Sequence, residues 1–180
     1  ALPLWRFLLG FALALALAIP LGLAMGYSKI FELLAKPVVE VFRPIPPIAW
    51  VPLFILIFAY FWGPIMVIFV GVLFPLLSNI YFGVKSVDPI LLDAARTQGA
   101  SRLQIFTKVV FPYTIPFLMT GIRIGMGIGW MCIVAAEMIG VQGGGLGYYI
   151  LTQALTLGLY DRMFAGMIVV AILGLLTTGI

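Results

Sequence analysis

Five long apolar segments dominate this sequence and restrict the chain to a membrane protein. A membrane-spanning helix needs about 20 predominantly apolar residues. Of the 180 residues, 64% are apolar and 9% are charged, whereas a soluble domain carries about 25% charged residues. We therefore predict an all-α fold, a polytopic membrane helix bundle forming one transmembrane domain over residues 1–180. The expected spans are 4–26, 48–62, 64–83, 113–139 and 163–180.

The composition also excludes several kinds of chemistry. The sequence has no histidine, and its single cysteine, Cys132, has no partner for an internal disulfide. We expect Cys132 to be inert packing, and we expect neither a metal site nor a bound cofactor. The basic residues are scattered, so nucleic acid is not an expected partner. Because the chain starts at Ala1 and stops inside an apolar run, we expect residues missing at both ends.

The first apolar segment has an alternative interpretation as a signal peptide. It lacks the basic start and the cleavage site that such a peptide needs, so we favour a membrane span. Basic residues then set the orientation, because cytoplasmic loops are enriched in Lys and Arg. Seven of them fall in two loops, against Arg6 and Arg162 on the other side. These seven are Lys29, Lys36, Arg43, Lys85, Arg96, Arg102 and Lys108. The N-terminus is predicted outside and the C-terminus in the cytoplasm.

The second and third spans are separated only by the turn 61–64, which predicts a tight antiparallel hairpin broken at Gly63-Pro64. Before them, residues 27–47 include an amphipathic stretch that we expect to form a helix at the membrane interface. Four prolines follow within 44–52. They indicate either a stiff re-entry turn, with Trp50 at the interface, or the kinked start of a pore-lining helix.

Small residues recur every four positions in two of the spans. Ala18, Gly22 and Gly26 form one such series, and Gly121, Gly125 and Gly129 form the other. Small residues at this spacing let helix backbones approach closely in lipid. They predict closely packed helices and say nothing further about function.

The cytoplasmic loop 84–112 carries strong local signals for two short helices. Asp88-Pro89 provides an N-cap and a first-turn proline, and Gly99 is placed for a left-handed C-terminal cap. Ser101 and Gln104 form a capping-box pattern for the second helix, which we expect Pro112 to end. Such a helix pair either lies on the membrane surface or fills a groove on a soluble partner. Local physics leaves both interpretations open.

The same loop resembles the signature of binding-protein-dependent ABC importer permeases. That pattern is Glu-Ala-Ala, three residues, Gly, nine residues, then Ile, any residue and Leu-Pro. Here Asp93-Ala94-Ala95, Gly99 and Val109-Val110-Phe111-Pro112 stand at the same spacing. Segments 46–52, 120–123, 134–140 and 145–148 are similar to the nitrate, sulfonate, taurine and bicarbonate branch.

The resemblance implies a transport subunit that is not itself an enzyme. Its partners would be a second permease copy in a homodimer, a pair of cytoplasmic ATP-binding subunits, an extracytoplasmic substrate-binding protein and the lipid bilayer. It implies a prokaryotic inner membrane, with ATP bound only by the partner. The substrate would be a small oxyanion, with a vitamin precursor or an aromatic compound as the alternative. The implied ATPase-coupling residues are Asp93, Ala94, Ala95, Gly99, Ala100, Ser101 and Pro112.

Three residues are candidates for the translocation path: Trp50, Arg123 and Glu137. Arg123 lies eleven residues past Pro112, about 16 Å along a helix and near mid-membrane. An arginine there is either a counter-charge for an anionic substrate or a structural residue bonded to neighbouring carbonyls. Glu137 shares its face but lies about 21 Å further on, so the two cannot pair. We expect Glu137 near the outer surface, bonding loop amides or meeting the binding protein.

Two other interpretations are less favoured. The glycine-rich stretch 140–147 lacks the Lys-Ser or Lys-Thr of a phosphate-binding loop, so we expect an outer loop, followed by a short outer helix over 148–160. A self-sufficient secondary transporter or channel would show internal repeats and acidic residues at mid-membrane. A membrane enzyme would need a clustered nucleophile and base. Neither set of features is present in the sequence.

Overall fold

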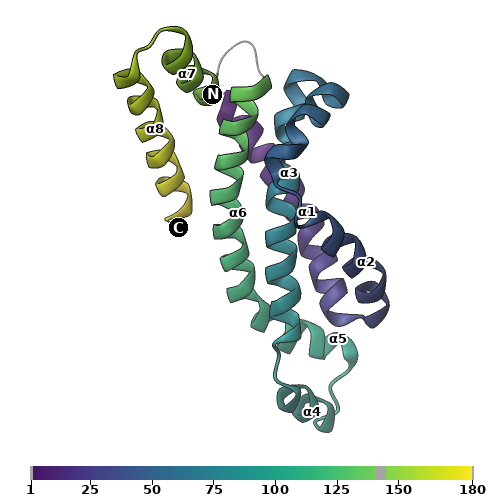
Figure 1. Ribbon diagram of the computed structural model, residues 1–180. Helices are drawn as coiled ribbons and strands as arrows, with labels where there is room; N and C mark the ends of the chain where they lie inside the picture. The colour runs from purple at the N-terminus through teal and green to yellow at the C-terminus, as the bar shows by residue number, and fades with distance from the viewer. Residues whose placement is uncertain (1, 141–144, 180) are drawn as a thin grey trace.

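The computed structural model describes residues 2–140 and 145–179, and this described part is helical with no β-strand (Figure 1). The glycine-rich residues 141–144 lie outside it. In chain order the elements are α1 (Leu2–Tyr27), α2 (Lys29–Phe42), η1 (Pro47–Trp50), α3 (Val51–Lys85), α4 (Pro89–Thr97), α5 (Arg102–Ile105), η2 (Phe106–Val110), α6 (Phe111–Gly140), α7 (Leu146–Leu151), η3 (Thr152–Thr156) and α8 (Tyr160–Thr178).

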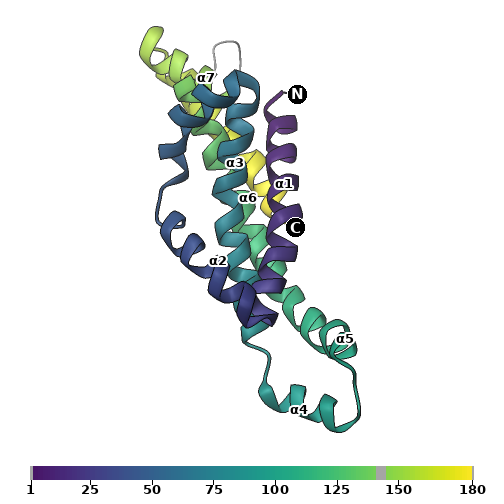
Figure 2. The same ribbon diagram turned by 90° about the vertical axis from the view of Figure 1, so that its right-hand side faces the viewer.

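The long helices run between two ends of an elongated bundle. The N-terminus and α7 lie at one end, and α4 and α5 lie at the other (Figures 1 and 2). Four segments are long and apolar enough to cross a membrane: Leu4–Tyr27, Phe61–Lys85, Arg102–Ile139 and Tyr160–Thr178. A fifth crossing would be a bent pair, Lys29–Phe42 with Pro47–Ala59, whose halves meet at 85°. The predicted membrane helix bundle is confirmed.

The hairpin between the second and third predicted spans exists, but its predicted break at Gly63-Pro64 is wrong. The backbone leaves helical geometry at Ala59, where φ is 58°. Pro64 is the fifth residue after Ala59 and lies inside the helix that follows the break. Gly63 instead allows the two halves of the hairpin to approach closely, because a methyl group there would lie 3.1 Å from the Cα of Ile55.

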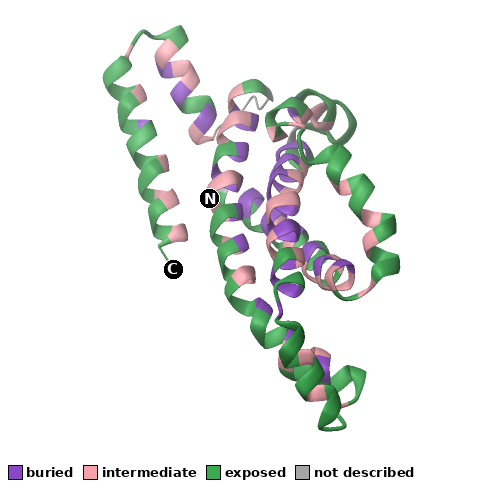
Figure 3. Cartoon of the chain, turned by 60° about the horizontal axis from the view of Figure 1, so that its bottom comes forward, coloured by how far each residue is buried: buried purple, intermediate pink, exposed green. Residues whose placement is uncertain are grey.

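The core lies where α1, α3 and α6 pack together. The two predicted series of small residues lie at the contacts between these helices. A methyl group on Gly22 would lie 2.9 Å from Ile80 Cβ, and one on Gly121 would lie 2.9 Å from Leu76 Cδ1. These glycines let α1 and α6 approach α3 closely. By contrast, α8, which ends at the label C in Figure 3, is mostly exposed.

Pro112 does not end the second helix of the loop as predicted. The chain stays helical from Arg102 to Ile139, and a π turn, η2, takes up the irregularity. Pro112 has no N–H for the carbonyl of Lys108, and its ring would crowd that carbonyl in a regular helix. Just before it, the N–H of Phe111 reaches back five residues to the carbonyl of Phe106. The wider turn thus carries the helix past the proline.

Two neighbouring glycines of α6 provide a matched test of this packing. A methyl group on Gly125 would lie 2.9 Å from Val72 Cγ1, whereas nothing lies within 4 Å of one on Gly127. We expect Gly125→Ala to destabilise the protein by about 1–3 kcal/mol through overpacking. Gly127→Ala should be neutral or stabilising by up to about 1 kcal/mol. Thermal unfolding in detergent measures both, and equal melting temperatures for the two variants would contradict the packing.

Candidate functional site

The loop between α3 and α6 is built from well-capped helices. The Asp88 side chain accepts a 2.8 Å hydrogen bond from the N–H of Ile90 at the start of α4. At the start of α5, the N–H of Gln104 donates to Ser101 Oγ, and the N–H of Ser101 donates to Gln104 Oε1. This reciprocal pair is the predicted capping box. The loop geometry therefore comes from its own local sequence.

Gly99 makes the turn between the two helices. Its φ is +78°, in the left-handed region. Its N–H donates to the carbonyl of Arg96, and the N–H of Ala100 donates to the carbonyl of Ala95 at 3.0 Å. This pair of bonds is the Schellman motif, which satisfies the last carbonyls of α4. A residue other than glycine would strain the turn, although there is open space for its side chain.

The loop has an inner face that packs and an outer face that does not. Val84, Val87, Ile105 and Val110 are buried in a small cluster of their own, on which Ala95 and Ala100 pack. No residue of α4 is buried, and Ile90 and Leu103 are more than 70% exposed. The two helices thus present an apolar outer surface that nothing in residues 2–140 and 145–179 covers.

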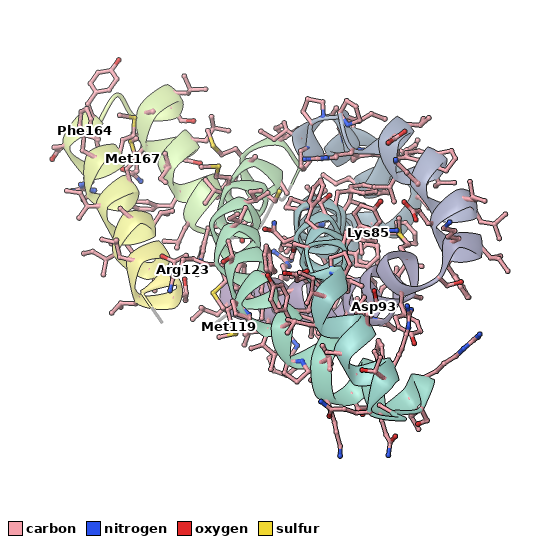
Figure 4. The ribbon with its side chains drawn as sticks, turned by 90° about the horizontal axis from the view of Figure 1, so that it is seen from below. Lys85, Asp93, Met119, Arg123, Phe164 and Met167 are labelled. Atoms are coloured by element: carbon pink, nitrogen blue, oxygen red, sulfur yellow. The ribbon has the colours of Figure 1, made fainter. Side chains whose placement is uncertain are left out.

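The predicted coupling residues divide between these faces. Asp93, Ala94, Gly99 and Ser101 are exposed, while Ala95 and Ala100 are half-buried against the small cluster. Asp93 forms a 2.9 Å ion pair with Arg96 on the surface of α4, and Figure 4 shows it on the loop at the end of the bundle. The seventh, Pro112, is exposed beyond the π turn and lies outside the helix pair.

Contacts from α1 and α2 fix the end of the bundle beside the loop. The Tyr27 hydroxyl donates to the carbonyl of Arg102 at 3.2 Å, and the Tyr27 ring packs edge-on against Phe106. Glu32 of α2 accepts hydrogen bonds from Lys85 Nζ at 2.6 Å and from the Tyr81 hydroxyl at 2.5 Å. A cavity of about 710 Å³ remains between α4, α5 and the bundle. The loop is therefore held to the bundle at its base and open at its tip.

The three predicted path residues do not come together. The Trp50 ring stacks on Phe54 at 5.5 Å near the bend between α2 and α3. Arg123 is exposed and lies on the side of α6 toward α8 in Figure 4. Arg123 lies seven residues before Trp130, so the two side chains leave α6 in directions only about 20° apart. The Trp130 indole N–H donates a 2.8 Å hydrogen bond to the Thr177 hydroxyl of α8.

Glu137, the third, is fully buried at the end of the bundle opposite the loop. Its Oε1 lies 3.8 Å from Arg6 Nη1, and its Oε2 accepts a 3.1 Å hydrogen bond from the N–H of Gly147. Sequence reasoning missed Arg6 as its partner, although both residues had been assigned to the same side of the membrane. That shared assignment was the signal available. Glu137 joins α1, α6 and the start of α7.

Among residues 2–140 and 145–179, no three Asp, Glu, His or Cys side chains are placed to hold a metal ion. What the geometry of the loop offers is a stiff, partly apolar surface for contact with another molecule.

Comparison with known proteins gives one consistent result. The family described as "binding-protein-dependent transport system inner membrane component" matches residues 18–180. A Methanocaldococcus jannaschii protein, provisionally named an ABC transporter permease, is 45% identical over 94% of this chain and 64% of its own length. The taurine transport system permease of Escherichia coli K12 is 36% identical over 98% of this chain and 64% of its own length. The nitrate import permease of Synechocystis is 34% identical over 95% of this chain and 62% of its own length. The chain thus spans less than two thirds of the length of these relatives.

The buried pair of Arg6 and Glu137 predicts a strong effect on stability. We expect Glu137→Ala to cost about 3–5 kcal/mol, because buried Arg6 loses this counter-charge and the N–H of Gly147 loses its acceptor. Glu137→Gln should cost less, since its amide oxygen still accepts from Gly147. Thermal unfolding in detergent measures both.

A double variant separates the ion pair from its neighbours. Adding Arg6→Met to Glu137→Gln should destabilise less than the two single changes summed, since neither buried charge then remains after losing the other as its counter-charge. Strict additivity of the two effects would show that the pair contributes nothing.

Proposed function

Because the chain belongs to the family of binding-protein-dependent transport inner membrane components, we propose that it pairs with a second copy of itself to form the path of an ATP-driven importer. In this proposal it contributes no chemistry: a separate pair of cytoplasmic subunits binds and hydrolyses ATP. An extracytoplasmic protein delivers the solute. The observation that carries the proposal is the loop 84–112, a rigid helix pair with an uncovered apolar outer face.

The role we propose for the loop is mechanical. The exposed side chains of Ile90 and Leu103, with Asp93 beside them, would sit in a cleft of the ATP-binding subunit. A helix laid into an apolar groove is a common mode of recognition. The caps at Asp88, Gly99 and Ser101 keep the loop stiff, so that movement of the partner is passed to α3 and α6. In this proposal the α4–α5 end lies in the cytoplasm and the N-terminus lies outside, as the basic residues predict.

A small anion is the solute we propose. Two of the relatives carry the names of a taurine and a nitrate transporter, and both of these solutes bear an anionic oxygen-rich group. We retain Arg123 and Trp50 as proposed path residues, with Arg123 as a counter-charge near mid-span. For Glu137 we propose a positioning role, because its carboxylate is occupied by Arg6 and Gly147. It would hold the outer end of α6 against α7.

Gly99 and Gly158 allow a matched test of coupling. Both have positive φ, +78° and +64°, with nothing within 4 Å of an added side chain, so Val imposes the same backbone strain at each. We expect Gly99→Val to reduce recovery of the ATP-binding subunit at least fivefold when the tagged full-length protein is purified from its native membrane. Gly158→Val, far from the loop, should leave recovery unchanged. Quantitative mass spectrometry of the bound proteins measures both.

A third variant separates backbone conformation from bulk. Asn tolerates positive φ better than other non-glycine residues, so Gly99→Asn should recover more of the ATP-binding subunit than Gly99→Val. Absence of any ATP-binding subunit with the wild-type protein would refute the proposed function. Equal loss of the ATP-binding subunit in the Gly99→Val and Gly158→Val variants would refute the role of the loop, but it would leave the proposed function standing.

A further inference from the structure

The cavity of about 710 Å³ between the loop and the bundle is lined by three basic side chains. Lys85 comes from the end of α3, Arg96 from α4 and Arg102 from the start of α5. No acidic side chain is among the described residues of the lining, and the cavity is half open, so a ligand can enter it. It lies at the α4–α5 end of the bundle in Figure 2. This end therefore offers a positively charged recess.

Two of the three charges are paired. Lys85 Nζ lies 2.6 Å from Glu32, and Arg96 Nη1 lies 2.9 Å from Asp93. Within residues 2–140 and 145–179, Arg102 forms no ion pair. The pair of Arg96 and Asp93 is exposed, and exposed ion pairs contribute little, so Arg96 can also turn to another anion. These groups leave one positive charge over, and the guanidinium of Arg102 carries it.

An apolar groove of about 540 Å³ adjoins this cavity. Tyr27 and Arg102 belong to the walls of both, so the two spaces meet at these residues. The rest of the groove wall comes from α1, the start of α2, and the α5–η2 segment, and its surface is almost entirely apolar. It includes Pro20, Leu23, Ala24, Phe31 and Phe106. A basic recess and an apolar groove side by side suit a ligand with an anionic head and a hydrocarbon tail.

The junction of the cavity and the groove lies at the membrane surface. The candidate spans Leu4–Tyr27, Phe61–Lys85 and Arg102–Ile139 each have one end here. The Tyr27 hydroxyl donates to the carbonyl of Arg102, which holds two of these ends together. Pro20, seven residues before Tyr27, lies about 10 Å further into the span. The groove thus runs from the level of the lipid phosphates into the hydrocarbon region.

We propose that the cavity and the groove together bind one anionic phospholipid from the leaflet on this side of the membrane. The phosphate lies between Arg102 and Arg96, and one acyl chain lies in the groove along α1. Basic pockets between membrane helices bind anionic lipid headgroups in this way. A free anion would leave the groove empty, and a zwitterionic lipid would bring its cationic group close to Lys85 and Arg96.

The bound lipid would join α1 to both helices of the loop. Leu103 borders the groove and also belongs to the outer face of the loop. The lipid would therefore lie next to the surface that we propose for the ATP-binding subunit, and it would help to hold the loop at its base. This inference goes beyond the proposed function and requires only that the bundle spans a membrane.

The test measures binding of dioleoylphosphatidylglycerol to the delipidated full-length protein by native mass spectrometry. Dioleoylphosphatidylcholine has the same acyl chains and no net charge, and we expect it to bind at least fivefold more weakly. Arg102→Gln should weaken phosphatidylglycerol binding about fivefold, the effect of one basic residue at an anionic membrane surface. Lys108→Gln removes the same charge from an exposed side chain outside both linings, so it should bind like wild type.

Ala24→Phe is a second variant, which fills part of the groove without changing charge, and it should weaken phosphatidylglycerol binding at least threefold. Glycerol 1-phosphate has the phosphate without the chains, and a tenfold molar excess of it should not displace the lipid. Size-exclusion profiles confirm that each variant is folded.

Equal binding of the two lipids, wild-type binding by Arg102→Gln, an equal loss in Lys108→Gln, or displacement by glycerol 1-phosphate would overturn the inference. So would a full-length protein that binds no phosphatidylglycerol, the result expected if a segment outside residues 1–180 covers the groove. Recovery of the ATP-binding subunit with wild-type protein tests the proposed function separately, so either can fail alone.

Discussion

The rest of the structure depends on one constraint: a backbone N–H or C=O group inside a bilayer has no water to bond with. The chain therefore stays helical through Pro112, using a π turn rather than a break. At the bend after α2, where the helix does stop, three of the residues 44–47 are prolines without an N–H. The remaining donor, on Ile45, is bonded within the bend. Proline at this bend thus limits the number of backbone groups that need a partner.

Close backbone packing is the second determinant, and it explains why some helices are held while others stand apart. Hydrocarbon side chains gain little by leaving lipid, so helix association depends on shape. Gly22 and Gly121 bring α1 and α6 against α3. In α8, Gly166 packs against Ile150 of α7, but Gly174 has nothing within 4 Å of an added methyl group, and the helix is mostly exposed. Rigid and loosely attached parts therefore differ in how their small residues are used.

Local features were predictable from sequence, and contacts between distant residues were not. The caps at Asp88, Gly99 and Ser101 depend on neighbours within five residues, and all three were found as predicted. The predicted break at Gly63-Pro64 was wrong: the chain turns at Ala59, Pro64 lies inside the helix that follows, and Gly63 packs against Ile55 on the other side of the turn. The pair of Arg6 and Glu137 was missed, since residues 131 positions apart show no spacing pattern.

The π turn makes one continuous rod of 38 residues from Arg102 to Ile139, about 57 Å long at 1.5 Å per residue. Its lower end carries the capped loop, and its upper end carries Glu137, bonded to Gly147. Such a rod acts as a lever. Pivoted at one end, a tilt of about 5° displaces the other end by about 5 Å, roughly the rise of one helical turn. A break in the helix at Pro112 would have allowed bending there, and bending would reduce the displacement that reaches the far end of the helix.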